Sequence, residues 1–177
     1  MMNGMDLPLA MMVLIPEAWN HNQNMDRSRR DLYHYYATMM EPWDGPASIV
    51  FSDGDLVGAL LDRNGLRPSR YYVTADHYLI LSSEVGVLDI DPAMVVKKDR
   101  LRPGKMLLVD TKAGKIIEDG DLKAHYAARR PYGEWLDQNL VYLKDLPVPN
   151  KKVEKLSDHQ RERLQRAFAY SYEDLTN

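Results

Sequence analysis

The distribution of apolar residues predicts two helices near the start of the chain. The apolar run Leu7–Ile15 predicts a short helix with Pro8 in its first turn, where a missing N–H costs nothing. Pro16 ends that helix. A second helix is predicted over Asp26–Met40, with Asp26 as the cap of its first amides. Its apolar stripe has i, i+3, i+4, i+7 spacing and consists of Leu32, Tyr35, Tyr36 and Met39.

Beyond these helices the pattern changes to short apolar strands separated by tight turns. Runs without strict alternation, such as Leu56–Leu61, are typical of strands that are covered on both faces. We therefore expect an α+β protein, mostly antiparallel hairpins with flanking helices, whose sheets lie between other layers. The predicted hairpins pair Ala47–Phe51 with Leu56–Leu61, Tyr71–Thr74 with Tyr78–Leu81, and Met106–Val109 with Lys115–Ile117.

The last third of the chain returns to helical patterns. Helices are predicted over Asp121–Arg129 and Tyr132–Tyr142. Leu146–Lys152 carries two prolines and is typical of a linker. We therefore place a boundary between residues 1–140 and 141–177.

A further helix is predicted over Arg161–Tyr170. Ser157 and Gln160 precede it with the spacing of a capping box. Its apolar stripe contains only Leu164 and Phe168, so we expect it to pack on something that this chain does not contain.

Charge and composition exclude several classes of partner. The 23 basic and 26 acidic side chains give a formal net charge of -3, which provides no general attraction to nucleic acid or anionic lipid. The run Leu7–Ile15 is too short to cross a bilayer, which needs about 20 residues. No basic segment precedes this run as it would in a signal peptide. We expect a cytoplasmic protein with no nucleic-acid partner and no membrane partner.

The chain contains no cysteine, so it holds no disulfide, thiolate metal site, iron–sulfur cluster or cysteine nucleophile. Two interpretations fit the carboxylates Glu17, Glu41 and Asp44, namely a cation site or solvated charge in turns, and the second is favoured. No cofactor or metal site is predicted within this chain. The histidines lack ligand spacing, and the arginines near the second helix fit a solvated face; these are His21, His34, His77, His125 and His159, and Arg27, Arg29 and Arg30.

One segment combines charged residues with a predicted bend between strands. Asn64 and Gly65 favour positive φ, and Pro68 restricts the residues before it to an extended exit. Arg63 and Arg67 could clamp a carboxylate, or Asp62 could pair with one of them and fix the bend. The structural interpretation is favoured because no nucleophile lies nearby. We assign no catalytic residue, and we assign a structural motif to Asp62, Arg63, Asn64, Gly65, Arg67 and Pro68.

Successive segments resemble motifs of the glutamate synthase large chain. The resemblance covers residues 7–136, and Gln165–Leu175 resembles the entry to the central domain of that family. The segments that carry it are Met12–Trp19, Met40–Ala47, Asp62–Pro68, Ser83–Asp89 and Leu101–Met106, followed by Val109-Asp110.

The resemblance implies a class II glutamine amidotransferase domain of the N-terminal-nucleophile type, with a four-layer αββα sandwich of which this chain is part. In that family an N-terminal cysteine attacks glutamine, its α-amino group acts as base, and Asn-Gly within Ala-His-Asn-Gly-Glu forms the oxyanion hole. An arginine and an aspartate hold the substrate's α-carboxylate and α-amino group. None of these residues maps onto this chain, because in the family they precede the region that it matches and the leading cysteine is absent. Asn64-Gly65 lies in a different motif, Asp62–Pro68.

The family resemblance also implies a role within a larger enzyme. The parent releases ammonia from glutamine and reductively aminates 2-oxoglutarate, using FMN, an iron–sulfur cluster, and NADPH, NADH or ferredoxin as electron donor. We expect residues 1–140 to be the C-terminal part of the glutaminase domain, and residues 141–177 to be a linker and the first helix of the central domain. The chain would supply scaffold to the rest of the polypeptide, without activity of its own.

Two other hypotheses compete with this assignment. An incomplete sandwich would expose strand edges and apolar surface, which suits a non-catalytic interaction or self-association module. A small independent enzyme would have to use Arg63, Arg67 and Glu84, without a nucleophile or a metal to accompany them.

Overall fold

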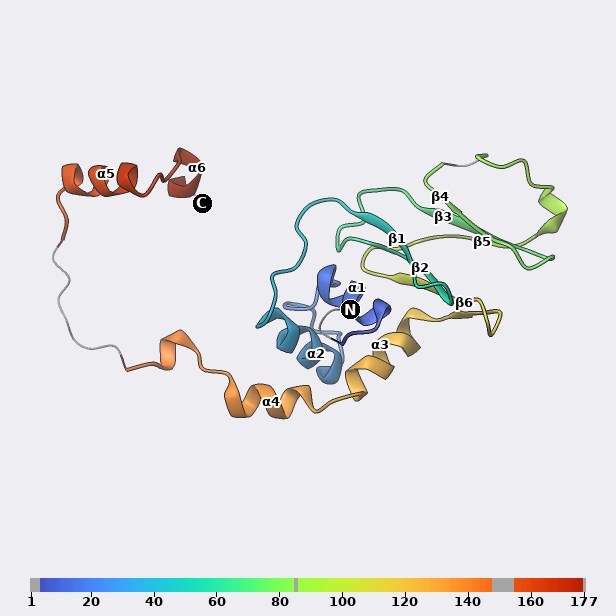
Figure 1. The fold of residues 1–177 in the computed structure, drawn as a ribbon, viewed down its shortest axis with the longest axis horizontal. Coiled ribbons are helices and arrows are strands. Elements are labelled where there is room, and N and C mark those ends of the chain that lie inside the picture. Colours follow the sequence, from blue (N-terminus) through green and yellow to red (C-terminus); the bar gives the residue numbers. More distant parts are fainter. Residues whose placement is uncertain (1–3, 85, 148–154, 177) are drawn as a thin grey trace. The chain divides into compact units, whose positions relative to one another are not determined.

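The first two helices pack at the start of a layered unit. In the computed structural model, which describes residues 4–84, 86–147 and 155–176, α1 spans Leu7–Leu14 and α2 spans Arg27–Ala37 (Figure 1). The structure divides into two units, Met1–Leu140 and Val141–Asn177. Both predicted helices are confirmed, but α2 ends earlier than expected. Met39 therefore lies beyond the helix and is 60% exposed instead of extending the apolar stripe.

The predicted cap of α2 is wrong in its chemistry. Asp26 does occupy the N-cap position, but its side chain accepts no hydrogen bond from the helix backbone. Its carboxylate instead pairs with the guanidinium of Arg29, at 3.5 Å. The carboxylate is held by Arg29, which lies about one turn further along the helix. The first amides of α2 therefore donate no hydrogen bond to the Asp26 side chain.

Two antiparallel sheets follow the helices, and all three predicted hairpins are confirmed. The first sheet has the order β1-β2-β6-β7, and the second has the order β4-β3-β5. The strands of the first sheet are β1 (Ser48–Ser52), β2 (Leu56–Leu61), β6 (Met106–Asp110) and β7 (Lys115–Ile117). Those of the second are β3 (Arg70–Thr74), β4 (Leu79–Ser82) and β5 (Val95–Arg100), preceded by a 3-10 turn at Pro92–Met94.

The central strands of the first sheet, β2 and β6, are buried on both faces over much of their length, and their alternate residues belong to two different cores. Leu60 and Leu108 pack against the helices, whereas Ala59, Leu61 and Leu107 pack toward the second sheet. This division follows from the two-residue period of a strand. It explains why β2 is apolar without alternation, and it confirms that the strand is covered on both faces.

The helix side of this sheet is completed by α3 (Asp119–Ala128) and α4 (Tyr132–Asn139), both close to their predicted ranges. Tyr132 is buried between α4 and α2, with its ring centroid 5.2 Å from that of Tyr35 and 5.8 Å from that of Tyr36. Trp135 adds a further ring at 5.2 Å from Tyr35. The tyrosines of α2 therefore serve in packing, as their spacing predicted.

The second unit is helical. It contains a 3-10 turn at Leu143–Asp145, α5 at Asp158–Ala167 and a short α6 at Tyr172–Thr176. The predicted capping box is confirmed, because Ser157 and Gln160 exchange hydrogen bonds between side chain and backbone. Much of the predicted linker lies outside the described residues. No helix in the described part of the chain is long and apolar enough to cross a membrane.

Replacement of Leu32 by alanine tests the helix-side core. Leu32 is fully buried, so its removal leaves a cavity among the helices and should lower the free energy of unfolding by about 2–5 kcal/mol. Met39→Ala is the control, because this side chain lies outside α2 and should change stability by less than about 0.5 kcal/mol. Urea unfolding followed by circular dichroism measures both. Equal losses would contradict the packing described here.

Candidate functional site

The bend after β2 is held by the carboxylate of Asp62. One oxygen accepts a hydrogen bond from the amide of Ala47 at 3.1 Å. The other accepts from the amides of Asn64 and Gly65, at 2.9 and 3.1 Å. Asp62 is therefore bound to backbone amides, and the predicted pairing with Arg63 or Arg67 is wrong. In the part of the chain that the structure describes, neither arginine joins an ion pair with it.

Gly65 is required at this bend for two reasons. Its φ is +61°, in the left-handed region that favours glycine. A Cβ at this position would also lie 2.5 Å from Cγ of Pro103, which is part of a rigid ring. The next residue, Gly104, donates its amide to the carbonyl oxygen of Asp62 at 3.2 Å. The bend is thereby fastened to the segment that enters β6.

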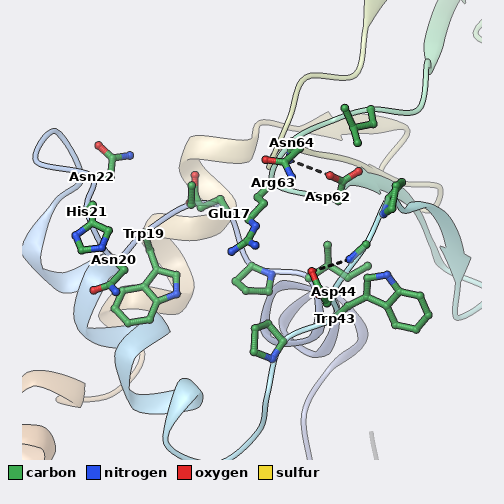
Figure 2. A pocket seen from close by; sticks show the side chains of 17 residues that line it. Glu17, Trp19, Asn20, His21, Asn22, Trp43, Asp44, Asp62, Arg63 and Asn64 are labelled. Atoms are coloured by element: carbon green, nitrogen blue, oxygen red, sulfur yellow. Dashed lines mark hydrogen bonds between the residues drawn. The ribbon is translucent and has the colours of Figure 1, made fainter. Parts of the chain in front are cut away.

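A cavity of about 490 Å³ opens beside this bend (Figure 2). It lies among three loops, 15–22, 42–46 and 62–66, and its lining includes Glu17, Trp19, Trp43, Asp44, Arg63 and Asn64. Figure 2 shows the side chain of Arg63 directed into the space between the Trp19 and Trp43 loops. Trp19 stacks on His34 of α2, and the amide of Trp43 donates to the Leu14 carbonyl at 2.7 Å, so both loops are anchored to helices.

The remaining residues of the predicted motif are distributed over two hollows. Arg67 and Pro68 border a second hollow, of about 550 Å³, together with Trp43 and Glu84. Arg63 belongs to the lining of the first. The set Arg63, Arg67 and Glu84, which an independent enzyme would need, is therefore divided between two hollows.

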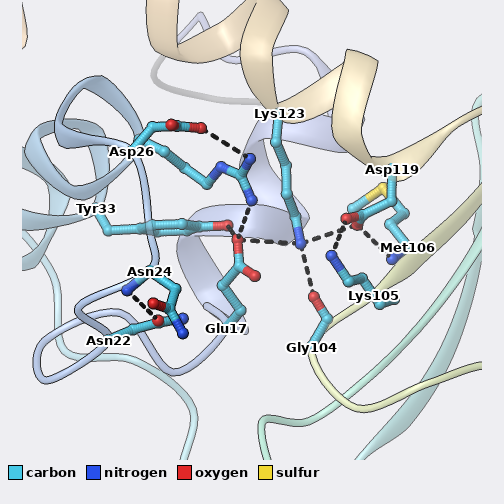
Figure 3. Close-up of polar contacts among 11 residues, drawn as sticks. Glu17, Asn22, Asn24, Asp26, Tyr33, Gly104, Lys105, Met106, Asp119 and Lys123 are labelled. Atoms are coloured by element: carbon cyan, nitrogen blue, oxygen red, sulfur yellow. Dashed lines mark hydrogen bonds and ion pairs between the residues drawn. The ribbon is translucent and has the colours of Figure 1, made fainter.

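A buried ammonium group connects the cavity to the helices (Figure 3). Lys123 of α3 is only 2% exposed. Its Nζ lies 3.2 Å from Oε1 of Glu17 and 2.8 Å from Oδ1 of Asp119, and it donates to the Gly104 carbonyl at 2.7 Å. An ammonium has three N–H groups, and three oxygen atoms lie within 3.2 Å of this one.

The two carboxylates of this cluster have further partners. Glu17 also accepts from the hydroxyl of Tyr33 at 3.1 Å and lies 3.8 Å from the guanidinium of Arg29. Asp119 accepts from the Met106 amide at 2.9 Å and pairs with Lys105 at 2.8 Å. These partners come from α2, α3 and the start of β6, so the cluster joins a cavity loop, two helices and the first sheet.

The cluster corrects two expectations drawn from the sequence. Glu41 and Asp44 are exposed, as expected for solvated charges in turns. Glu17 differs from them, because its carboxylate is nearly buried. Arg29 and Arg30 do not form a solvated face either. Arg29 pairs with Glu17, and Arg30 donates to the carbonyls of Asn22 and Met25. The i, i+4 spacing of Asp119 and Lys123 could have indicated their ion pair, but Glu17 and the Gly104 carbonyl are distant along the chain and no sequence pattern connects them to Lys123.

The environment of these groups shifts their protonation equilibria. Burial and the neighbouring Glu17 carboxylate raise the pKa of Tyr33 well above its usual value. Burial alone would raise the pKa of Asp119, but the charge of Lys123 and hydrogen bonds from Lys105, Lys123 and Met106 outweigh it and hold the pKa below its usual value. For Asp62 the three amide donors outweigh burial in the same way and lower its pKa. Asp62 and Asp119 are therefore stabilised as carboxylates.

The arrangement is suited to holding loops in place, since most of its polar groups are engaged with one another. The described residues contain no group of three or more His, Cys, Asp or Glu side chains placed to hold a metal ion. No thiol is present to act as nucleophile.

Comparison with known proteins identifies the family. Residues 1–135 match the family described as glutamine amidotransferases class-II. The chain belongs to the class-II glutamine amidotransferases. The bend, the cavity and the Lys123 cluster all lie within the matched region, and the resemblance noted in the sequence is confirmed.

Individual relatives with which this amidotransferase segment shares sequence are glutamate synthases. It is 49% identical over 164 residues to glutamate synthase [NADPH] large chain of Bacillus subtilis, which covers 93% of this chain and 11% of that protein. It is 50% identical over 140 residues to glutamate synthase [NADH] of Schizosaccharomyces pombe, covering 79% of this chain and 7% of that protein. A third relative is ferredoxin-dependent glutamate synthase 1, chloroplastic/mitochondrial, of Arabidopsis thaliana, 43% identical over 94% of this chain and 10% of that protein. The chain spans about a tenth of the length of these relatives.

Replacement of Asp62 by alanine tests the bend of this amidotransferase. The change leaves the Ala47 amide buried without an acceptor and should lower the free energy of unfolding at pH 7 by about 2–4 kcal/mol. Because the folded pKa of Asp62 is depressed, its contribution is present above the ordinary aspartate value of about 3.9 and is lost as pH falls through the folded pKa. The difference between wild type and variant should therefore shrink between pH 7 and pH 3, as urea unfolding at both values would measure.

Asp53→Ala is the matched control for this experiment. Asp53 makes the same kind of contact, accepting from the amides of Asp55 and Leu56, but it lies in an exposed hairpin turn. We expect a smaller loss of stability there than at Asp62. A difference for Asp62→Ala that stays constant with pH would contradict the proposed role of its charge.

Replacement of Lys123 by methionine tests the buried cluster. The change keeps a long unbranched side chain but leaves Glu17 and Asp119 without their shared cation, and should cost about 3–5 kcal/mol in unfolding free energy. Lys105→Met removes the other cation of Asp119, which is partly exposed, and should cost less than about 1 kcal/mol. A loss for Lys123→Met no larger than that for Lys105→Met would count against a central role for the buried ammonium.

Proposed function

We propose that this chain forms the supporting part of the glutaminase domain of a glutamate synthase. The observation that carries the proposal is the match of residues 1–135 to the class-II amidotransferases in a sequence without cysteine. The chemistry of that family, as the resemblance implies it, requires a thiol nucleophile. These residues therefore supply strands, helices and the fastened bend, and the nucleophile comes from another part of the parent polypeptide.

The same proposal extends to the architecture. Helices pack on one face of the central strands of the first sheet and the second sheet packs on the other, and this order supports assignment to an αββα sandwich. The other face of the second sheet then receives the fourth layer. We assign residues 1–140 to the glutaminase domain and residues 141–177 to a linker and the first helix of the central domain. The end of the family match at residue 135 and the change of structural unit after Leu140 support this boundary.

The parent enzyme, in this proposal, releases ammonia from glutamine and uses it to convert 2-oxoglutarate to glutamate. NADPH, NADH or ferredoxin is the electron donor, as in the names of the relatives. An iron–sulfur cluster is bound through cysteine thiolates, and this chain has none. The cavity lining contains the carboxylates Glu17, Asp44 and Asp62 against one arginine, which does not suit the phosphate of FMN. Both groups are therefore held elsewhere in the parent.

A glutaminase assay tests this assignment directly. The 177-residue chain alone should release no ammonia from glutamine above the buffer rate, because it has no thiol. The same chain extended by the upstream part of a glutamate synthase that carries the N-terminal cysteine should hydrolyse glutamine. Coupled detection of glutamate and ammonia measures both.

Substitution of that upstream cysteine by alanine provides the control, and should abolish the restored activity while leaving the circular dichroism spectrum unchanged. Turnover by the chain alone, or turnover that survives loss of the cysteine, would refute the proposal.

A further inference from the structure

The bend after β2 contains a chemically labile pair of residues, Asn64-Gly65. A backbone amide that follows asparagine can attack its side chain, and glycine has no Cβ to obstruct the approach. The nitrogen of Gly65 would form a bond to Cγ of Asn64, and the bond from Cγ to Nδ2 would break. The proton of the Gly65 amide passes through solvent to the departing nitrogen, which leaves as ammonia. Water then opens the resulting succinimide to aspartate or isoaspartate. Asn64 is exposed, so water reaches it.

The attacking nitrogen is already engaged in the folded bend. The amide of Gly65 donates to Oδ2 of Asp62 and to the carbonyl oxygen of Asp62, both at 3.1 Å. The amide of Asn64 donates to the same Oδ2 at 2.9 Å (Figure 2). The nitrogen of Gly65 attacks only after it loses its proton, and a negative charge next to it disfavours that loss. The carboxylate of Asp62 therefore opposes the reaction at the atom where it begins.

The packing around Gly65 opposes the reaction as well. A Cβ on Gly65 would lie 2.5 Å from Cγ of Pro103, so the proline ring is packed directly against this residue. The amide of Gly104 donates to the Asp62 carbonyl at 3.2 Å and fastens the bend from the other side. To close the succinimide ring, the peptide between Asn64 and Gly65 must turn toward the Asn64 side chain. That turn would break the hydrogen bonds to Asp62.

We propose that Asn64 is a deamidation site, which the Asp62 carboxylate keeps unreactive as long as the bend is folded. The reaction proceeds through the fraction of molecules in which the bend is locally open. The inference concerns the chemistry of this chain alone and does not depend on the proposed glutaminase function.

Deamidation would prevent the bend from closing again. Aspartate at position 64 adds a carboxylate to a cavity lining that already contains those of Glu17 and Asp62. Isoaspartate lengthens the backbone by one carbon atom and moves the amide of Gly65 away from Asp62. Either product weakens the contacts that hold the bend, so the modification permanently marks the molecules whose bend has opened.

The experiment compares deamidation of Asn64 in the folded and the unfolded chain. The 177-residue chain is incubated in mildly alkaline buffer with and without guanidinium chloride, and peptide mass spectrometry follows the conversion of amide to acid. Peptide mapping separates Asn64 from the other Asn-Gly pair of the sequence, Asn3-Gly4. Because a hydrogen bond to a charged acceptor must be broken before attack, Asn64 should react roughly tenfold more slowly, or slower still, in the folded chain.

Asp62→Asn tests the role of the charge. The change keeps the size of the side chain but removes the carboxylate, and should accelerate deamidation of Asn64 in the folded chain by roughly tenfold or more. Leu32→Ala is the control, because Leu32 lies in the helix-side core and its loss lowers overall stability without touching the bend. It should accelerate the reaction less than Asp62→Asn, when both variants are compared under conditions in which circular dichroism shows them folded.

Asp53→Asn provides a matched comparison that leaves the bend unaltered. It places a further Asn-Gly pair in the exposed hairpin turn between β1 and β2. There the amide of Gly54 donates to the uncharged hydroxyl of Ser52 at 3.1 Å, and a Cβ on Gly54 would meet nothing within 4 Å. The asparagine placed in this turn should deamidate roughly tenfold faster than Asn64 in the same molecule, or faster still. The rate at Asn64 should stay unchanged.

Three results would each overturn the proposal. The first is deamidation of Asn64 as fast in the folded chain as in guanidinium chloride. The second is a rate in Asp62→Asn no higher than in Leu32→Ala. The third is an Asn-Gly pair in the hairpin turn of Asp53→Asn that reacts as slowly as Asn64, and this result remains informative if Asp62→Asn fails to fold.

Discussion

The first unit depends on the burial of one ammonium group. Taking the charge of Lys123 out of water is unfavourable unless every N–H finds an acceptor and the charge is balanced. Glu17, Asp119 and the Gly104 carbonyl meet both conditions. Because these acceptors come from a cavity loop, a helix and the entry to β6, the requirement of one side chain fixes the positions of three separate segments. The same Gly104 donates its amide to Asp62, so the constraint extends to the bend after β2.

The second constraint is that the central strands of the first sheet, β2 and β6, are buried on both faces. Leu60 and Leu61 are neighbours in sequence but belong to different cores, one with the helices and one with the second sheet. The helices bury their apolar side chains against one face of β2 and β6, and the second sheet buries its own against the other face. Both layers therefore depend on the first sheet. This relation suits a supporting role, because the segments that border the cavity are anchored to layers that stabilise one another.

The sequence predicted those features whose causes are local. Hairpins were found because Asp53 and its neighbours form a turn between apolar runs, and the capping box because Ser157 and Gln160 act on one helix end. β5 was missed because its charged sequence lacks the apolar pattern of a strand, and its pairing with β3 joins distant segments. The role of Glu17 was misjudged for the same reason. Its main partner lies on α3, and no spacing in the sequence relates the two.

The bend motif illustrates why residue types alone do not identify a catalytic site. Asp62, Arg63 and Asn64 resemble a reactive constellation in composition, yet both carboxylate oxygens of Asp62 are already occupied by backbone amides. Three amide hydrogen bonds stabilise the ionised form of Asp62, so its protonation would weaken the bend that it holds. Arg63 lines the same cavity as Asn64, and a guanidinium can hold a carboxylate but is not a nucleophile. In the function that we propose, the chemistry of this family enters the domain from residues outside this chain, which this scaffold holds in place.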